Sequence, residues 1–244
     1  MAIIDLPMAG KICLVTGATA GIGEATASGL ASLGATVILA GRNIQRCSAS
    51  VERIKQGTRN PEIAYLVADL SSQREVRRLA NEFKTRYARL DVLVNNVGAI
   101  NLARRSTVDG IELTFALNHL SYFLLTDLLI DLMISSAPAR IVNVSSSSHR
   151  QTGINLENLQ GRGWYRGFRA YAQSKLGNVL FSYELARRLE GTGVTANALH
   201  PGVVATRFLC NNGKIGPIFS FFFGLRGISP SEGALTSIYL ASSN

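Results

Sequence analysis

The chain has 244 residues, of which 47% are hydrophobic, and a formal net charge of +9. This length and apolar fraction indicate one globular domain with a full core. The basic residues are scattered arginines rather than a run interleaved with aromatic residues, which argues against nucleic acid as a partner. They indicate either a solvated surface or attraction to an anionic membrane face or a polyanionic cofactor.

The cysteines, the histidines and the amino-terminal residues give no indication of a metal site, a catalytic group or a signal peptide. The three cysteines are far apart and no Cys/His cluster occurs, so we expect free buried thiols, a reducing compartment and no metal site. The three histidines are isolated in sequence and are interpreted as structural. Residues 1–8 contain Asp5 and no basic start, so we expect no signal peptide and a cytoplasmic location.

The first predicted unit is strand, glycine turn, helix and strand. An apolar strand at 11–15 leads into a glycine-rich turn at 16–23, a periodic helix ends at Gly34, and a β-rich run follows at 36–40. Such a unit cradles a dinucleotide, because glycines let the backbone approach the pyrophosphate and the helix presents free N–H groups to it.

The glycine spacing narrows the family. Thr16 begins Thr-Gly-x-x-x-Gly-Ile-Gly, which differs from the general Gly-x-Gly-x-x-Gly fingerprint and resembles the short-chain dehydrogenase/reductase family. The resemblance implies an NAD(P)-dependent oxidoreductase. Its implied cofactor contacts in this turn are Gly17, Thr19, Gly21, Ile22 and Gly23.

The end of the second strand bears on the cofactor. An acidic residue there would bind the ribose 2′-hydroxyl of NAD, whereas this sequence reads Ala40-Gly41-Arg42-Asn43. Arg42 is suited to pair with a 2′-phosphate, so we favour NADP(H) over NAD(H). The alternative is that Arg42 merely caps a loop.

The alternation of helices and strands continues along the chain. We expect helices at 44–56 and 71–89, with Ser71 or Ser72 as N-cap of the second, and strands at 62–68 and 90–94.

Two cofactor segments follow these strands by resemblance. Asp69, followed by Leu70, matches the family's adenine contact, and Asn95-Asn96-Val97-Gly98 matches its Asn-Asn-Ala-Gly motif. That motif steadies the central strand and lines the cofactor, which implies contacts from Asn95, Val97 and Gly98. Here Val97 places a larger side chain than alanine near the cofactor.

Residues 106–135 form a long apolar segment. Its core is too short to span a membrane and carries Asp127 and Asp131 on one face, so we expect a buried helix. Asn118 is a poor helix former at mid-helix. By resemblance it is the catalytic asparagine, which holds a water linked to the lysine, and the helix is a dimer interface.

The fifth strand, at 140–144, leads into four serines at 145–148. Such a position is where open parallel sheets place ligands, although serine runs are also ordinary loops. The family's Asn-x-Ser-Ser pattern maps onto 143–146. We assign Ser146 to the substrate oxygen, with Ser145 or Ser147 as alternatives.

Residues 149–169 form a longer loop than shorter family members carry, and with the Ala-Tyr-x-x-Ser-Lys that follows it resembles the retinol dehydrogenase-like branch. Trp164, Tyr165 and Phe168 line an apolar pocket mouth in one interpretation and are loop packing in the other.

Tyr171 and Lys175 are one helical turn apart, so their side chains leave the same face. A lysine ammonium beside a phenol favours the phenolate, and together with a cofactor cation it would lower the tyrosine pKa from its usual ~10 and make Tyr171 a proton donor and acceptor at neutral pH. The same spacing also occurs by chance in many helices. By resemblance, Lys175 also binds the cofactor ribose, and Tyr171 lies beside the nicotinamide.

A sixth strand, at 194–199, precedes a turn at 201–206 that matches the family's Pro-Gly-x-x-x-Thr. The resemblance implies cofactor contacts at Pro201, Gly202, Val204 and Thr206. The aromatic stretch 218–225 is interpreted as a substrate lid, a subunit contact or a membrane contact.

A capping box with proline at the first helical position opens a last helix from Ser229 to about Tyr239. Six strands alternating with helices predict a Rossmann-type α/β fold over 1–244: one doubly wound parallel sheet, apparently without the family's seventh strand.

The predicted function is NADP(H)-dependent interconversion of a hydrophobic alcohol and its aldehyde or ketone. Ser146, Tyr171, Lys175 and Asn118 would form the proton relay. The alternatives are a non-catalytic cofactor-binding sensor or scaffold and a membrane-surface retinoid reductase. We expect a homodimer or homotetramer, with peripheral membrane contact as a further expectation.

Overall fold

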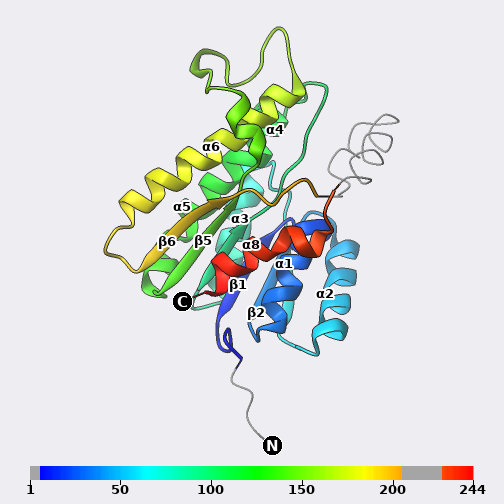
Figure 1. Cartoon of the computed structure of the whole chain (residues 1–244), viewed down its shortest axis with the longest axis vertical. Helices are drawn as coiled ribbons and strands as arrows, with labels where there is room; N and C mark the ends of the chain where they lie inside the picture. Colours follow the sequence, from blue (N-terminus) through cyan, green and yellow to red (C-terminus); the bar gives the residue numbers. More distant parts are fainter. Residues whose placement is uncertain (1–5, 205–226, 244) are drawn as a thin grey trace, which may run out of the picture.

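The computed structural model describes residues 6–204 and 227–243. Its centre is a six-stranded parallel sheet of order β3-β2-β1-β4-β5-β6 (Figure 1). The strands are β1 (Ile12–Thr16), β2 (Thr36–Gly41), β3 (Ile63–Val67), β4 (Val92–Asn95), β5 (Ala139–Val144) and β6 (Val194–Leu199). Each lies within two residues of its predicted range, and the doubly wound fold is confirmed. The strand order reverses between β1 and β4, where such sheets bind ligands.

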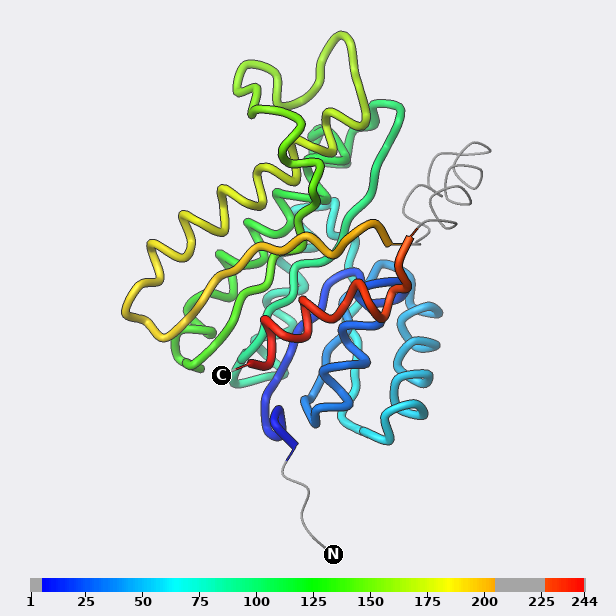
Figure 2. Tube along the Cα trace, viewed as in Figure 1, coloured from blue at the N-terminus to red at the C-terminus, as the bar shows by residue number. Residues whose placement is uncertain are grey.

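Helices cover both faces of the sheet. One layer contains α1 (Gly21–Ser32), α2 (Ile44–Thr58) and α8 (Pro230–Ser242), and the other contains α3 (Gln73–Arg86), α5 (Ser121–Ser135) and α6 (Gly167–Arg188). Figure 2 shows α8, from the end of the chain, lying beside α1, from its start. The two helices pack so closely that a Cβ at Gly29 would lie 2.3 Å from Cδ1 of Ile238.

Alternation along the strands builds the two cores. Leu14 and Ile38 point to the α3–α5 layer, whereas Val15 and Leu39 point to the α1–α2 layer, and all four side chains are fully buried. A central parallel sheet covered on both faces requires such continuous apolar runs. The residues at the carboxyl ends of the strands are therefore held by a rigid frame.

The long apolar segment is one continuous helical stretch: α4 (Leu113–Phe115), a π-helical turn (Ala116–Leu120) and α5. By length and composition, Leu113–Ser135 is a candidate membrane span, a test that core helices of globular proteins also pass. Leu125, Leu129 and Met133 are buried in the core, whereas Asp127 and Asp131 are exposed on the other face. One face of α5 is thus buried as expected.

The predicted N-terminal caps of α3 and α8 differ in how well they agree with the structure. Ser72 is the N-cap of α3, but its side chain makes no capping bond within the described residues; the Asp109 carboxylate accepts from Gln73 N instead, at 2.8 Å. The capping box of Ser229 and Glu232 at α8 is confirmed. Thr206 and the stretch 218–225 lie outside the described residues.

Candidate active site

The glycine turn between β1 and α1 is packed directly against the start of the segment after β4. A Cβ at Gly17, whose φ is +65°, would lie 2.8 Å from Cα of Val97, and one at Gly23 would lie 2.4 Å from the Gly17 carbonyl oxygen. Only glycine permits this approach. Asn96 braces the turn, because its Nδ2 donates to the Thr16 carbonyl at 2.9 Å. The motif contained Asn96, but sequence reasoning gave it no role.

The turn fits a dinucleotide phosphate. Ala20 is the N-cap of α1, and among the described residues no side chain caps its first turn, so the helix presents free N–H groups there. Ile22 belongs to this first turn, and Thr19 lies against Gly41 at the end of β2. Arg42 follows at once, is exposed and forms no ion pair with any described residue. Its guanidinium is therefore available to an anion beside the turn.

Four other predicted cofactor residues lie at or just after the carboxyl ends of β3 and β4. Leu70 is buried in the core, and the Asp69 carboxylate accepts from Ser71 N at 3.0 Å and Ser71 Oγ at 2.8 Å. The Asn95 side chain donates to Thr126 Oγ1 at 3.0 Å and to an asparagine on β5 at 2.9 Å, and it is fully buried. A ligand contact from Leu70 or Asn95 would therefore come from the backbone. Gly98 follows Val97 at the same edge of the sheet.

The structure separates the serines that the sequence left open. Ser145 is buried and its Oγ donates to the Lys175 carbonyl at 2.8 Å, whereas Ser146 is half-buried and forms a side-chain hydrogen bond with Tyr171. Ser147 is exposed at the start of a short 3-10 helix. Of the three hydroxyls, that of Ser146 is the one beside the phenol.

Lys175 and Tyr171 lie together in the interior, on α6. Lys175 Nζ donates to the Val144 carbonyl at 2.8 Å and lies 5.8 Å from the centroid of the Tyr171 ring and 5.5 Å from that of Tyr122. Burial lowers the pKa of Lys175 to about 7.

The expected lowering of the Tyr171 pKa is wrong for the protein alone. Burial raises the pKa of this phenol, and the hydrogen bond from Ser146 offsets the rise only in part. The physical reason is that desolvation disfavours the charged form of each partner. A lysine whose own pKa is near neutrality does not supply a full positive charge to its neighbour.

Asn118 lies in the π-helical turn and forms hydrogen bonds with Ala99, Ser174 and Asn178. Its side chain pairs with both backbone groups of Ala99 at 2.9 Å and donates to Ser174 Oγ at 3.1 Å. Its carbonyl accepts from Asn178 Nδ2 at 2.9 Å, and Ser174 Oγ donates to the Tyr171 carbonyl at 2.7 Å. The network thus connects Asn118 to α6 through Ser174 and Asn178. Sequence reasoning missed both, although α6 periodicity places them on the Tyr171–Lys175 side.

The turn after β6 is tied to the segment that precedes α8. Gly202 has φ +86°, and a Cβ there would lie 2.9 Å from Cδ1 of Ile228. Ile228 N donates to the Val203 carbonyl at 2.9 Å, and Val204 pairs with Ile228 in a short parallel bridge. Pro201, Gly202 and Val204 are therefore held at the carboxyl end of β6.

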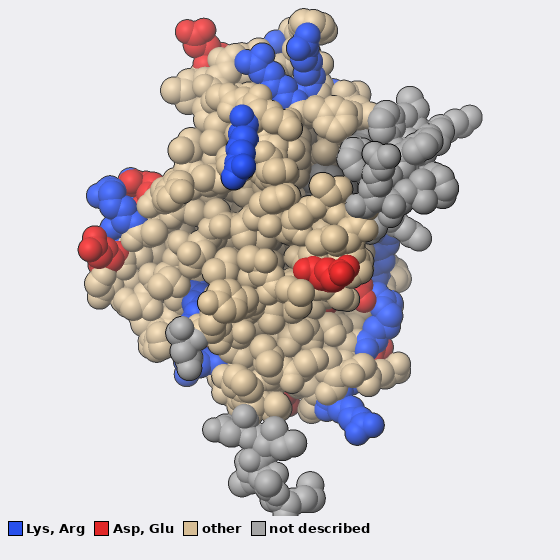
Figure 3. All heavy atoms as spheres, viewed as in Figure 1, with Lys and Arg blue, Asp and Glu red and all other residues tan. Residues whose placement is uncertain are grey.

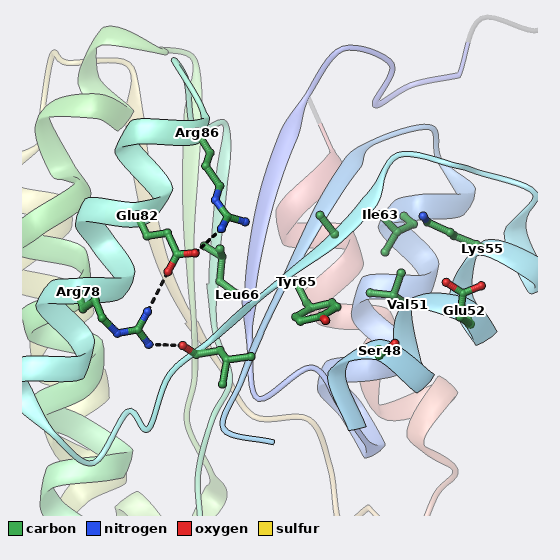
Figure 4. A pocket seen from close by; sticks show the side chains of 12 residues that line it. Ser48, Val51, Glu52, Lys55, Ile63, Tyr65, Leu66, Arg78, Glu82 and Arg86 are labelled. Atoms are coloured by element: carbon green, nitrogen blue, oxygen red, sulfur yellow. Dashed lines mark hydrogen bonds and ion pairs between the residues drawn. The ribbon is translucent and has the colours of Figure 1, made fainter. Parts of the chain in front are cut away.

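A separate groove lies away from these residues. It has a cavity volume of about 550 Å³ at the β3 edge, between α2 and α3, and its lining contains no predicted site residue (Figure 4). The Arg78 guanidinium closes part of the groove by donating to the Val67 carbonyl. On the face in Figure 3, basic side chains stand at the upper end and along the edges, separated by uncharged surface.

The fold and the site define a dinucleotide-binding oxidoreductase of the doubly wound parallel-sheet class. The sequence model of the family "short chain dehydrogenase" matches residues 11–214, and the chain belongs to that family. Human retinol dehydrogenase 14 is 42% identical over 97% of this chain and 75% of its own length. Human retinol dehydrogenase 11 is 41% identical over 98% and 74%. The predicted retinol dehydrogenase-like branch is thereby confirmed.

Solved structures agree with this assignment. A crystal structure from Mycobacterium paratuberculosis superposes with a TM-score of 0.78 at 35% identity, covering 98% of this chain and 80% of that one. RhlG of Pseudomonas aeruginosa, in an active-site complex with NADP, superposes with a TM-score of 0.75 at 30% identity, covering 98% and 92%.

Proposed function

We propose that this protein is an NADP(H)-dependent oxidoreductase that interconverts a hydrophobic alcohol and its aldehyde or ketone. The observation that supports this most strongly is the convergence of Ser146, Tyr171 and Lys175 at the carboxyl end of β5. That end of the sheet also carries the glycine turn. Hydroxyl, phenol and amine thus lie where a parallel sheet binds its ligand.

The nicotinamide, when bound, supplies or accepts the hydride. Ser146 and the Tyr171 phenol donate hydrogen bonds to the substrate carbonyl oxygen and stabilise the charge that develops on it. Tyr171 gives its proton to that oxygen in reduction and takes it back in oxidation. Lys175 binds the ribose hydroxyls and helps to restore the phenol proton through the relay that Asn118 holds in place.

The preference for NADP(H) depends on Arg42. This exposed guanidinium directly follows β2, where a carboxylate would otherwise bind the 2′-hydroxyl. A bidentate contact with a 2′-phosphate is its natural use. By the same proposal, the backbone at 201–204 faces the nicotinamide, and Asp69 lies near the adenine.

The substrate is proposed to be apolar, and a retinoid is the particular candidate because the relatives named above are retinol dehydrogenases. Trp164 lies in the long loop that precedes α6, which we call the insert, and Phe168 lies in the first turn of α6. Both side chains are exposed and would lie at the mouth of the site. With the net charge of +9, these rings also support peripheral contact with an anionic membrane face. Flotation with vesicles that contain phosphatidylserine, compared with phosphatidylcholine alone, tests that contact.

Self-association is proposed through α5 and α6. Phe123, Leu180 and Tyr183 are about half to three-quarters exposed on these adjacent helices. The Phe123 ring packs against that of Phe181 in a tilted arrangement, with ring centroids 5.5 Å apart. Exposed aromatic and aliphatic groups of this kind are typical of an interface core. Sedimentation equilibrium should show a dimer or tetramer, and a monomer at micromolar concentration would contradict the proposal.

One experiment distinguishes an enzyme from a non-catalytic sensor that only binds the cofactor. Purified protein is incubated with NADPH or NADH and a panel of aldehydes and ketones that includes all-trans-retinal, and absorbance at the nicotinamide band is followed. We expect consumption of NADPH with apolar carbonyl compounds. NADPH binding without consumption on the whole panel would favour the sensor.

A further inference from the structure

Glu112 is a buried carboxylate outside the proposed catalytic group. Its residue is 1% exposed, and it is the N-cap of α4. Its two oxygens accept from Thr114 N and Phe115 N, each at 2.7 Å. A capping carboxylate needs only these two bonds and can remain in water. Helix capping does not explain a third contact that Glu112 makes, which comes from a distant segment of the chain.

That contact is Tyr165, in the insert before α6. Its hydroxyl lies 2.9 Å from Glu112 Oε1, 3.2 Å from the Asn101 carbonyl and 3.2 Å from Thr114 Oγ1. Burial raises the pKa of Tyr165, so its single proton stays on the oxygen. Because the bond to the carboxylate is the shorter and is charge-assisted, Tyr165 donates to Glu112. The hydroxyl of Thr114 donates to Tyr165 in turn.

Two further contacts join the insert to the same region. Gln160 Oε1 accepts from Glu112 N at 2.8 Å, and the Gln160 carbonyl accepts from Arg104 Nε at 2.9 Å. The beginning of the insert is bound to α6, where Gln173 Oε1 accepts from Asn155 N at 2.9 Å. The insert is therefore fastened at its start, middle and end.

The contacts at the end of the insert hold residues 99–102, the segment after β4, in place. Asn118 holds this segment at Ala99, as described above. At the other end, α6 packs so closely that a Cβ at Gly167 would lie 2.3 Å from the Asn101 carbonyl oxygen. Between these two points Ile100 packs against the Tyr171 ring, and Leu102 packs beside them. Residues 99–102 therefore form an apolar wall next to the phenol.

We propose that Glu112 and Tyr165 are positioning residues that hold this wall against the carbon skeleton of the substrate and so determine preference for large apolar substrates. The proposal rests on the proposed function, because it assigns the substrate-facing wall of that same site. Neither residue touches the reacting atoms. Their effect is transmitted through Thr114, whose hydroxyl donates to Tyr165 and accepts from Asn101 Nδ2 at 3.1 Å, and Asn101 neighbours Ile100.

The test is Tyr165→Phe, which removes one hydroxyl, compared with the wild type and with Tyr239→Phe. Tyr239 is on α8, exposed, and its hydroxyl bonds to no described residue. With all-trans-retinal, Tyr165→Phe should raise KM about tenfold and change kcat less than twofold. With propanal, whose short chain offers the wall far less apolar surface than retinal does, KM should change less than twofold. The milder Gln160→Ala should raise KM for retinal about threefold and decides the matter if Tyr165→Phe does not fold.

A readout without turnover keeps this proposal separate from the proposed function. Hydrogen exchange of the amides at 99–102 should be at least tenfold faster in Tyr165→Phe than in the wild type or Tyr239→Phe. If the wild type reduces neither aldehyde, the proposed function fails. The exchange rates alone then decide whether Tyr165 and Glu112 hold residues 99–102 in place. The proposal is overturned by equal exchange in all three proteins, by an unchanged KM for retinal, or by equal losses for both aldehydes.

Discussion

Replacing Lys175 with methionine tests the electrostatics of the site through stability alone. Methionine has a similar length and no charge, so it fills the same volume without a desolvation cost. In the folded protein burial lowers the pKa of Lys175 to about 7, whereas the unfolded chain has the ordinary value of 10.5. Between these two values the unfolded state binds a proton that the folded state does not. The stability of the wild type relative to the variant therefore rises with pH in that window.

The magnitude follows from the two pKa values. Below about pH 6 both states are protonated and the lysine contributes no pH dependence. Between pH 6 and pH 9 the folded state releases its proton while the unfolded state keeps it, which is a gain of about 2.5 kcal/mol for the wild type. Lys175 is 2% exposed, so solvent screening does not reduce this figure. The lost hydrogen bond to the Val144 carbonyl is a constant offset at both pH values.

Urea unfolding of both proteins at pH 6 and pH 9 measures the effect, since the difference between wild type and variant cancels the other titrating groups. Lys84→Met, at an exposed lysine, controls for the loss of one positive charge. We expect the free-energy difference between wild type and Lys175→Met to shift by about 2.5 kcal/mol in favour of the wild type as the pH rises. A difference that stays the same at both pH values would refute the assignment of a buried lysine with a lowered pKa.

Three further predictions follow from the site. Arg42→Asp should shift the ratio of KM values for NADPH and NADH at least tenfold toward NADH, since a charge-assisted contact contributes about 1.5–3 kcal/mol; an unchanged ratio in steady-state kinetics would exclude Arg42 from the ribose site. Gly23→Ala should abolish NADPH binding and lower the Tm, because its Cβ meets a carbonyl at 2.4 Å, whereas Gly57→Ala, which opens onto free space, should bind normally. Ser146→Ala should lower kcat about 100-fold or more; Ser145→Ala should mainly cost about 1 kcal/mol of stability from its lost bond to the α6 backbone, and the reverse pattern would exchange their roles.

The sequence predicted the frame of the molecule well, because apolar strands and glycine turns are local signals. The parallel sheet and the position of the glycine turn needed only short windows of sequence. The placement of Tyr171 and Lys175 on one helical face is likewise a matter of spacing. Such features are readable because the physics that fixes them acts within a few residues.

What the sequence could not show are contacts between distant segments. The choice between Ser145 and Ser146 depends on which hydroxyl lies beside the Tyr171 phenol and which bonds to the α6 backbone. The roles of Asn96, Glu112 and Tyr165 depend on partners far away in the chain. In the protein without cofactor, Lys175 does not lower the Tyr171 pKa, for a related reason. Spacing reveals a neighbouring charge, but only the packed structure reveals how much desolvation opposes it.

The central claim is that the Tyr171 phenol transfers the proton beside a docked nicotinamide, and Tyr171→Phe measured in a single turnover tests it most directly. The variant is mixed with excess NADPH and an aldehyde that the wild type reduces, while the dissociation constant of NADPH is measured by fluorescence. We predict an NADPH dissociation constant within about twofold of the wild type and a rate of reduction lowered at least 1000-fold, which corresponds to about 4 kcal/mol of transition-state stabilisation. Reduction at a rate near that of the wild type, with the same pH profile, would contradict the account.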